Sequence, residues 1–226
     1  MVNYAVIVGK LKDDPEEFET YSGEKIARFS LVCDSETGAG TNSLPISLYG
    51  EDADMVLQMC KQGHTLGVQG RVKVTENDAR GTTFTEITSR QGVVLNTVVE
   101  SENAAMVDFP ECLHTINHVV LVGKVVDKPV KITDDTGEQY AQFVIGCERE
   151  FKNRKGERIT DYIPCLLWED SVNFWMDNCH AGQQVGFQWE IEVDYDDAGG
   201  LYFTEIVGRW ATIIDRKVTD SRHTRP

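Results

Sequence analysis

The sequence predicts an all-β fold in which one small module, with five strands and one helix, occurs twice in tandem. Two observations predict it: an internal repeat that covers most of the 226 residues, and β-branched runs separated by turn residues within each copy. The apolar content of 41% is sufficient for packed cores, and the chain length suits two small domains.

The repeat is defined by two constant offsets. At an offset of 114 residues, the shared positions include a Val-Gly-Lys run and a late cysteine: Asn3, Val8, Gly9, Lys10, Pro15, Gly23, Ala27, Phe29 and Cys33 match Asn117, Val122, Gly123, Lys124, Pro129, Gly137, Ala141, Phe143 and Cys147. Beyond Cys33 the offset becomes 119, and Pro45, Cys60, Gly63, Gly67 and Glu86 match Pro164, Cys179, Gly182, Gly186 and Glu205. We therefore expect a module over residues 1–97, an acidic linker over 98–116, a second module over 117–215 and a flexible basic tail over 216–226.

Each copy is expected to contain strand, strand, strand, helix, strand and strand, in that order. The predicted strands cover residues 6–8, 26–33, 44–49, 65–75 and 82–90 in the first copy, and 119–122, 140–147, 162–168, 184–195 and 201–210 in the second. Apolar residues at helical spacing, from Ala53 to Cys60, predict the helix, and Gly63 and Gly182 are expected to be its left-handed C-caps. This order is typical of the OB-fold, a five-stranded Greek-key barrel.

The sequence shows no pattern typical of an enzyme, a metal site or a cofactor site. The six cysteines include no C-x-x-C pair, and the five histidines have no carboxylate or cysteine at ligand or triad spacing. Phosphate-binding and dinucleotide-binding glycine motifs are absent from the sequence as well. With neither a signal peptide nor an apolar run of about 18 residues, the sequence predicts a cytoplasmic protein without a membrane partner.

The net charge of −15, from 22 basic and 37 acidic residues, argues against a polyanionic partner. The acidity is spread over the whole chain, but one stretch is an exception. Residues 149–158 carry five bases, Arg149, Lys152, Arg154, Lys155 and Arg158, against only Glu150 and Glu157.

The order of these motifs resembles the bacterial and mitochondrial single-stranded DNA-binding protein family. The resemblance is carried by Val8-Gly9-Lys10-Leu11, Asp14-Pro15, Ala27-Arg28-Phe29-Ser30-Leu31, Leu48-Tyr49-Gly50 and Gly70-Arg71-Val72, and by Val122-Gly123-Lys124, Ala141-Gln142-Phe143, Trp168-Glu169-Asp170 and Thr204-Glu205 in the second copy. It implies a non-enzymatic, sequence-independent binder of single-stranded DNA in replication, repair or recombination, associated with the nucleoid when bound. Four OB-folds per assembly would then require a homodimer, with replication or repair proteins as further partners.

Single strands offer base faces for stacking and phosphates for ion pairing. On the family pattern, the second module supplies the stacking residues Phe151, Tyr162, Trp168 and Tyr195 beside the five bases of residues 149–158. Tyr162 and Trp168 are six residues apart on one strand, so they are expected on one face, with Ile163, Cys165 and Leu167 in the core. Tyr49, Arg71 and Lys73 of the first module and Lys10 and Lys124 of the two Val-Gly-Lys runs complete the candidate set.

Departures from the family pattern keep alternatives open. Residues 34–43 of the first module contain neither a base nor an aromatic residue, which predicts a degenerate DNA groove there. Acidic residues surround Tyr195, and the tail is basic instead of ending in the acidic tip typical of the family's bacterial members. The chain would then be a protein-interaction or primosome-type module with weak or no DNA binding. RNA binding is a third option. The aromatic residues would alternatively be core or subunit contacts, and the basic stretch a solvated hairpin tip.

Overall fold

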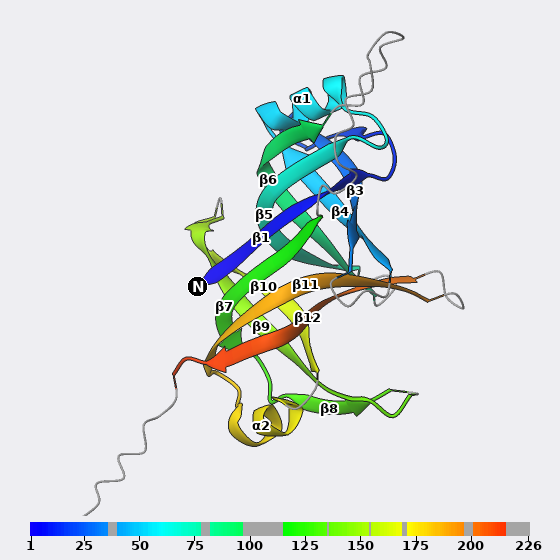
Figure 1. The fold of residues 1–226 in the computed structure, drawn as a ribbon. Coiled ribbons are helices and arrows are strands. Elements are labelled where there is room, and N and C mark those ends of the chain that lie inside the picture. The colour runs from blue at the N-terminus through cyan, green and yellow to red at the C-terminus, as the bar shows by residue number, and fades with distance from the viewer. Residues whose placement is uncertain are drawn as a thin grey trace, which may run out of the picture.

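The computed structural model describes residues 1–35, 40–77, 82–96, 115–134, 136–153, 155–168, 171–196 and 201–215. The first module contains β1 (Val2–Leu11), β2 (Glu16–Glu19), β3 (Lys25–Asp34), β4 (Thr41–Tyr49), α1 (Glu51–Met59), β5 (Thr65–Asn77) and β6 (Thr82–Asn96). The second contains β7 (Ile116–Val125), β8 (Val130–Thr133), β9 (Gln139–Lys152), β10 (Arg158–Trp168), α2 (Ser171–Asn178), β11 (Gln184–Asp196) and β12 (Leu201–Ile213) (Figure 1).

Each module is a five-stranded barrel, which confirms the predicted tandem OB-folds. The first runs in the order β3-β4-β6-β5-β1 and closes where β1 pairs with β3. The second repeats this arrangement with β9-β10-β12-β11-β7, and β7 closes it against β9. In both, the pairing between the third long strand and the last strand is parallel. The short strands β2 and β8, which the sequence did not predict, extend each sheet by one edge strand.

The barrel cores follow the alternation of the strands. In β10, Ile163, Cys165 and Leu167 are completely buried, as predicted, and Tyr162 therefore points outward. Trp175 of α2 is buried on the same core, where its ring stacks on Phe143 at 5.2 Å between centroids. The helices therefore cover one end of each barrel and leave the outer face of β10 and its counterpart β4 open.

The two modules are joined by antiparallel pairing of β1 with β7 in one continuous sheet. Its register pairs Ala5 with Val119, which occupy the same position in the repeat. The pairing is therefore symmetric about this point, and a pseudo-twofold axis relates the modules. The repeated asparagines obey the same symmetry: the Asn3 side chain donates to the Val72 carbonyl at 2.8 Å, and Asn117 donates to that of Ile191 at 2.8 Å.

The repeated glycine and cysteine lie where β1 and β7 pass between neighbouring strands. A Cβ on Gly9 would lie 2.6 Å from the Val32 carbonyl oxygen and 2.8 Å from the Cys33 sulfur. The Cys33 thiol donates to the Val8 carbonyl at 3.4 Å, and burial raises its pKa to about 12. Cys147 repeats this contact with the Val122 carbonyl at 3.9 Å, and burial likewise raises its pKa to about 12. Close approach of the backbones thus explains the repeated glycine.

Two local predictions were wrong. Gly63 is not the C-cap of α1: Cys60 is, with an extended backbone, and Gly63 provides the positive φ of 85° in the turn that leads into β5. The predicted strands over residues 140–147 and 162–168 left residues 149–158 as a loop between them, but β9 continues to Lys152 and β10 begins at Arg158, so three of the five bases lie in strands. Long, twisted hairpin strands have no local signal that marks where pairing ends.

The predicted domain boundaries stay a prediction, because residues 97–114 and 216–226 lie outside the described residues. Strand β7 begins at Ile116, the last residue assigned to the linker. Among the described residues, neither helix is long and apolar enough to cross a membrane.

Replacing Gly9 by Ala should destabilise the fold by about 1–3 kcal/mol, because the added methyl group would overlap the Val32 carbonyl and the Cys33 sulfur. Gly67→Ala is the matched control, since its Cβ would meet only side-chain atoms at 3.6 Å or more. Denaturant unfolding measures both, and equal stability of the two variants would contradict the close-approach explanation.

Candidate nucleic-acid interface

The outer face of β10 carries two of the predicted aromatic residues. Tyr162 is 55% exposed, and its ring lies beside Gly146 of β9, where a Cβ would be 3.6 Å from Tyr162 Cε1. Trp168 is half-buried against Tyr140, with ring centroids 4.9 Å apart. Tyr162 thus offers a ring for stacking, whereas part of Trp168 is covered within its own module.

The hairpin of β9 and β10 extends from the second barrel past the start of β1 (Figure 1). Phe151 near its tip is 82% exposed, an unusual position for an apolar ring. Lys152 and Lys155 are exposed beside it, whereas Arg158 pairs with Glu148. Arg154 lies outside the described residues. The hairpin therefore presents an aromatic ring and cations together, as the sequence predicts.

The buried carboxylate of Asp161 binds arginines from both modules. Arg149 Nε donates to its Oδ2 at 2.9 Å and Nη2 to its Oδ1 at 2.6 Å, in a bidentate pair. Arg71 of the first module donates from Nη1 to Oδ2 at 2.8 Å. The Asp161 side chain is only 4% exposed. Two candidate residues that the sequence assigned to different modules thus meet at one junction.

A hollow of about 540 Å³ on the first module adjoins this junction. Three of the four predicted site residues of the first module line it, namely Tyr49, Arg71 and Lys73, together with Arg90. The second module contributes Phe151. The Arg90 guanidinium lies 5.8 Å from the Tyr49 ring centroid and pairs with Glu24 at 2.7 Å. We call this hollow, with Phe151 at its margin, the junction groove.

The remaining candidates lie elsewhere. Lys10 and Lys124 are exposed near the C-terminal ends of β1 and β7, outside the lining of the junction groove. Tyr195 pairs with Tyr202 in the β11–β12 hairpin, but its side chain lies outside the described residues. Arg90 and Asp161 were not among the predicted site residues. Arg90 belongs to the repeat, matching Arg209, whereas the sequence gives no signal for the contacts of Asp161 across the modules.

A second hollow on the first module has the opposite charge. Its volume is about 660 Å³, and its lining includes Asp13, Asp14, Glu16 and Glu86 against Arg28 and Lys73. Lys73 also pairs with Glu86 at 2.6 Å. Four carboxylates around one hollow disfavour phosphate groups. Of the two hollows, the junction groove therefore suits a polyanion better.

Comparison with known proteins decides the family. Residues 2–95 and 116–207 match the single-strand binding protein family, so that both barrels are covered. The chain belongs to this family. Its members bind DNA and are not enzymes, in agreement with the resemblance seen in the sequence.

Similar proteins are found among both sequences and solved structures. The single-stranded DNA-binding protein of Lactiplantibacillus plantarum is 30% identical over 111 residues, which cover 48% of this chain and 56% of that protein. Single-stranded DNA-binding protein 1 of Streptococcus agalactiae is 31% identical over 108 residues, covering 46% of this chain and 66% of the relative. The crystal structure of the wild-type single-stranded DNA binding protein from Thermus aquaticus has the same fold, with a TM-score of 0.71 at 15% identity over 100% of this chain and 98% of that one. The chain thus spans between half and two-thirds of the length of these curated relatives.

In this family member, Asp161→Asn should lower the free energy of unfolding by about 3–5 kcal/mol, because it removes the charge that compensates two guanidinium groups in a buried setting. Asp14→Asn is the control: its pair with Lys61 is exposed and screened by solvent, so its loss is expected to matter much less. Chemical denaturation compares the two, and a loss no larger for Asp161→Asn would show that the junction pair is not stabilising.

Proposed function

We propose that this chain binds single-stranded DNA without sequence preference, by base stacking and phosphate contacts, in replication, repair or recombination. The observation that carries the proposal is the β9–β10 hairpin of a family member, where the exposed rings of Phe151 and Tyr162 accompany exposed lysines. An exposed aromatic ring beside cations is the combination that binds single strands irrespective of base identity.

The net charge of −15 does not oppose this proposal at short range. At cellular salt, charges are screened over roughly 8 Å, so a phosphate at the hairpin responds mainly to the local charges, and in residues 149–158 five bases outnumber Glu150 and Glu157. Each base–aromatic stack contributes about 1–3 kcal/mol, which is insensitive to salt. Stacking is therefore expected to provide most of the affinity, and ion pairing the smaller part.

A second candidate function is a protein-interaction or primosome-type module with weak or no DNA binding. The acidic hollow lined by Asp13, Asp14, Glu16 and Glu86 favours it, because such a surface suits a basic partner. The two functions differ in one observable, which is affinity for a single strand at low salt.

Titration of a labelled oligo-dT of about 35 nucleotides, the length at which several OB-folds are engaged, should show tight binding by fluorescence anisotropy. If about three phosphates are contacted, log K should fall with log salt at a slope near −2. Tyr162→Ala should weaken binding by about 5–150-fold through the loss of one stack.

Tyr21→Ala is the matched control for this titration, because Tyr21 is fully exposed in the β2–β3 turn and does not belong to the lining of the junction groove. Failure of the wild-type protein to bind at low salt would favour the interaction module. A parallel titration with oligo-U separates DNA from RNA preference.

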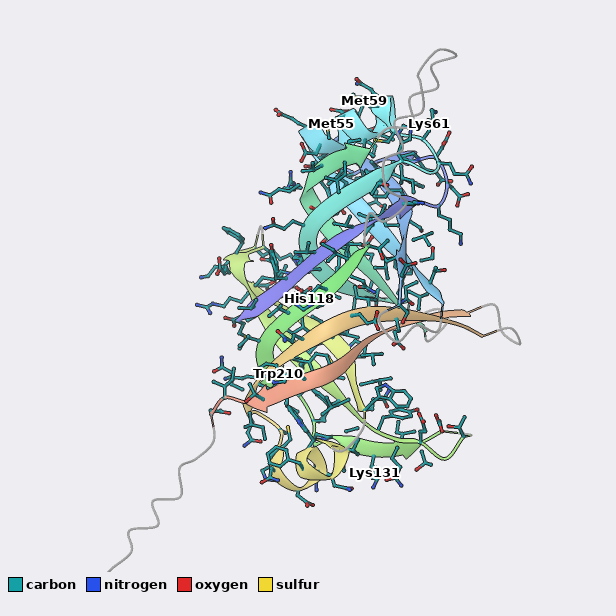
Figure 2. All side chains as sticks on the ribbon, in the orientation of Figure 1. Met55, Met59, Lys61, His118, Lys131 and Trp210 are labelled. Atoms are coloured by element: carbon teal, nitrogen blue, oxygen red, sulfur yellow. The ribbon has the colours of Figure 1, made fainter. Side chains whose placement is uncertain are left out.

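We further propose that two chains associate into a homodimer that contains four OB-folds. The β1–β7 register places Tyr4 beside Val120, Gln188 and Trp210 in one row across four strands on the outer face of the sheet. Tyr4 is 37% exposed and Trp210 53%, and Val2 and Ile116 are exposed nearby. Figure 2 shows Trp210 on β12 and His118 on β7 along this stretch of sheet. An exposed apolar strip of this kind indicates an interface.

The double variant Tyr4→Glu/Trp210→Glu should therefore be a monomer by light scattering at micromolar concentration, because two carboxylates would be buried in the interface. Tyr21→Glu should keep the mass of the wild-type assembly. A monomeric wild-type protein, or a double variant with unchanged mass, would contradict this dimer.

A further inference from the structure

The residue types that a single-strand site requires are divided unequally between the modules. In β5 of the first module, Arg71 and Lys73 occupy the positions that Glu190 and Glu192 occupy in β11. Conversely, Phe151 and its lysines in the second module correspond to a segment of the first that contains neither a base nor an aromatic residue. The first module thus has the cations of the groove, and the second has the aromatic hairpin.

The fold brings these complementary halves together. Phe151 lines the junction groove with Tyr49, Arg71, Lys73 and Arg90, although it belongs to the other barrel. The contact between β10 and β5 holds this arrangement through the Arg71–Asp161 pair at 2.8 Å. An aromatic ring from each module and cations from the first therefore border one continuous surface.

The pseudo-twofold axis generates a second junction of opposite character. The equivalents of Arg71, Asp161 and Arg149 there are Glu190, Asn42 and Ser35. The Glu190 carboxylate is fully buried, and Ser35 Oγ donates to it at 3.4 Å. The first junction contains two guanidinium groups and one carboxylate, whereas none of the three equivalent residues at the second is a base. Among these described residues, only those of the first junction therefore offer a phosphate chain a cationic passage between the modules.

At the cationic junction, Asp161 leaves most of the guanidinium donors available. Arginine has five N–H donors; Asp161 accepts from Nε and Nη2 of Arg149 and from Nη1 of Arg71. The arginine side chains are 27% and 32% exposed, so each still reaches solvent. Asp161 thus fixes the orientation of both groups, which lowers the entropy that is lost when they bind a phosphate.

From these observations we propose that each chain has one composite site at the junction groove, where a single DNA segment crosses between the two barrels. Tyr49 and Phe151 stack on its bases, Arg71, Arg90 and Arg149 contact its phosphates, and Asp161 is a positioning residue. The proposal rests on the proposed binding of single-stranded DNA and deepens it. Two separate grooves, one in each module, are the arrangement that it replaces.

The experiment uses the full chain and a labelled oligo-dT of about 12 nucleotides, which fits the site size of one OB-fold. Phe151→Ala should weaken binding at least about fivefold with an unchanged salt slope, because stacking carries no charge. Arg71→Gln and Arg90→Gln should weaken the same binding event and reduce the slope by about 0.7 each. Lys131→Gln is the control for the charge change, since Lys131 lies on β8 at the far end of the second module (Figure 2).

The possible outcomes distinguish a failure of the composite site from a failure of the proposed binding of single-stranded DNA. The composite site would be overturned if Arg71→Gln and Arg90→Gln had the same affinity and the same salt slope as Lys131→Gln. The proposed single-strand binding would then remain intact. Two binding events per chain, one sensitive only to Phe151→Ala and the other only to the arginine variants, would overturn it as well. Absence of wild-type binding would instead refute the proposed function. Arg90→Gln is the variant that is expected to fold normally, because the Arg90 side chain is 68% exposed and its replacement leaves the ion pairs of Asp161 intact.

Discussion

The antiparallel pairing of β1 with β7 is the constraint on which the rest of the molecule depends. Because β1 pairs with β7 through residues 2–8, only Lys10 and Leu11 are left to close the first barrel against β3. The second barrel closes through an equally short pairing of β7 with β9. The strand that closes each barrel thus also joins the two barrels. Gly9 and Cys33 lie where β1 changes partner, and their counterparts Gly123 and Cys147 lie at the equivalent point of β7. Repeated glycine and cysteine are consequences of this exchange of partners.

A symmetric backbone joint does not require symmetric side chains. The β1–β7 pairing fixes the orientation of the two barrels. It therefore fixes where β10 contacts β5 and where β11 contacts β4, because one pseudo-twofold axis relates these two contacts. Once the backbones are fixed, a substitution at one junction leaves the other unchanged. Arg71 and Asp161 form an ion pair at one of them, whereas the equivalent Glu190 and Asn42 are different residue types. Duplication within one chain therefore permits a charge asymmetry that two identical subunits related by the same axis would not have.

Local and repeated patterns predicted the parts of this structure that depend on local physics. The alternation in β10 placed Ile163, Cys165 and Leu167 in the core, because successive side chains of a strand point to opposite faces. The repeat predicted two equivalent barrels. The pairing of β1 with β7 was not predictable in this way, since an edge strand carries no local mark of its partner in another module. The Arg71–Asp161 pair was missed for the same reason, and Gly63 was misassigned because a helix C-cap and a tight turn demand the same positive φ.

The effect of the acidic composition depends on where the charged residues lie in the fold. A uniformly basic surface would bind single strands in any orientation, and would also attract other polyanions such as duplex DNA. Here the carboxylates of Asp13, Asp14 and Glu16 border the hollow beside β3 and β4, while Arg71 and Arg90 line the junction groove. A phosphate chain is then repelled from one surface and attracted to its neighbour within roughly a Debye length. Exposed rings such as Phe151 favour unpaired bases, because a duplex has no free base face to stack on them. In the proposed function, the acidic body thus restricts where a strand lies, and the aromatic residues restrict which nucleic acid it is.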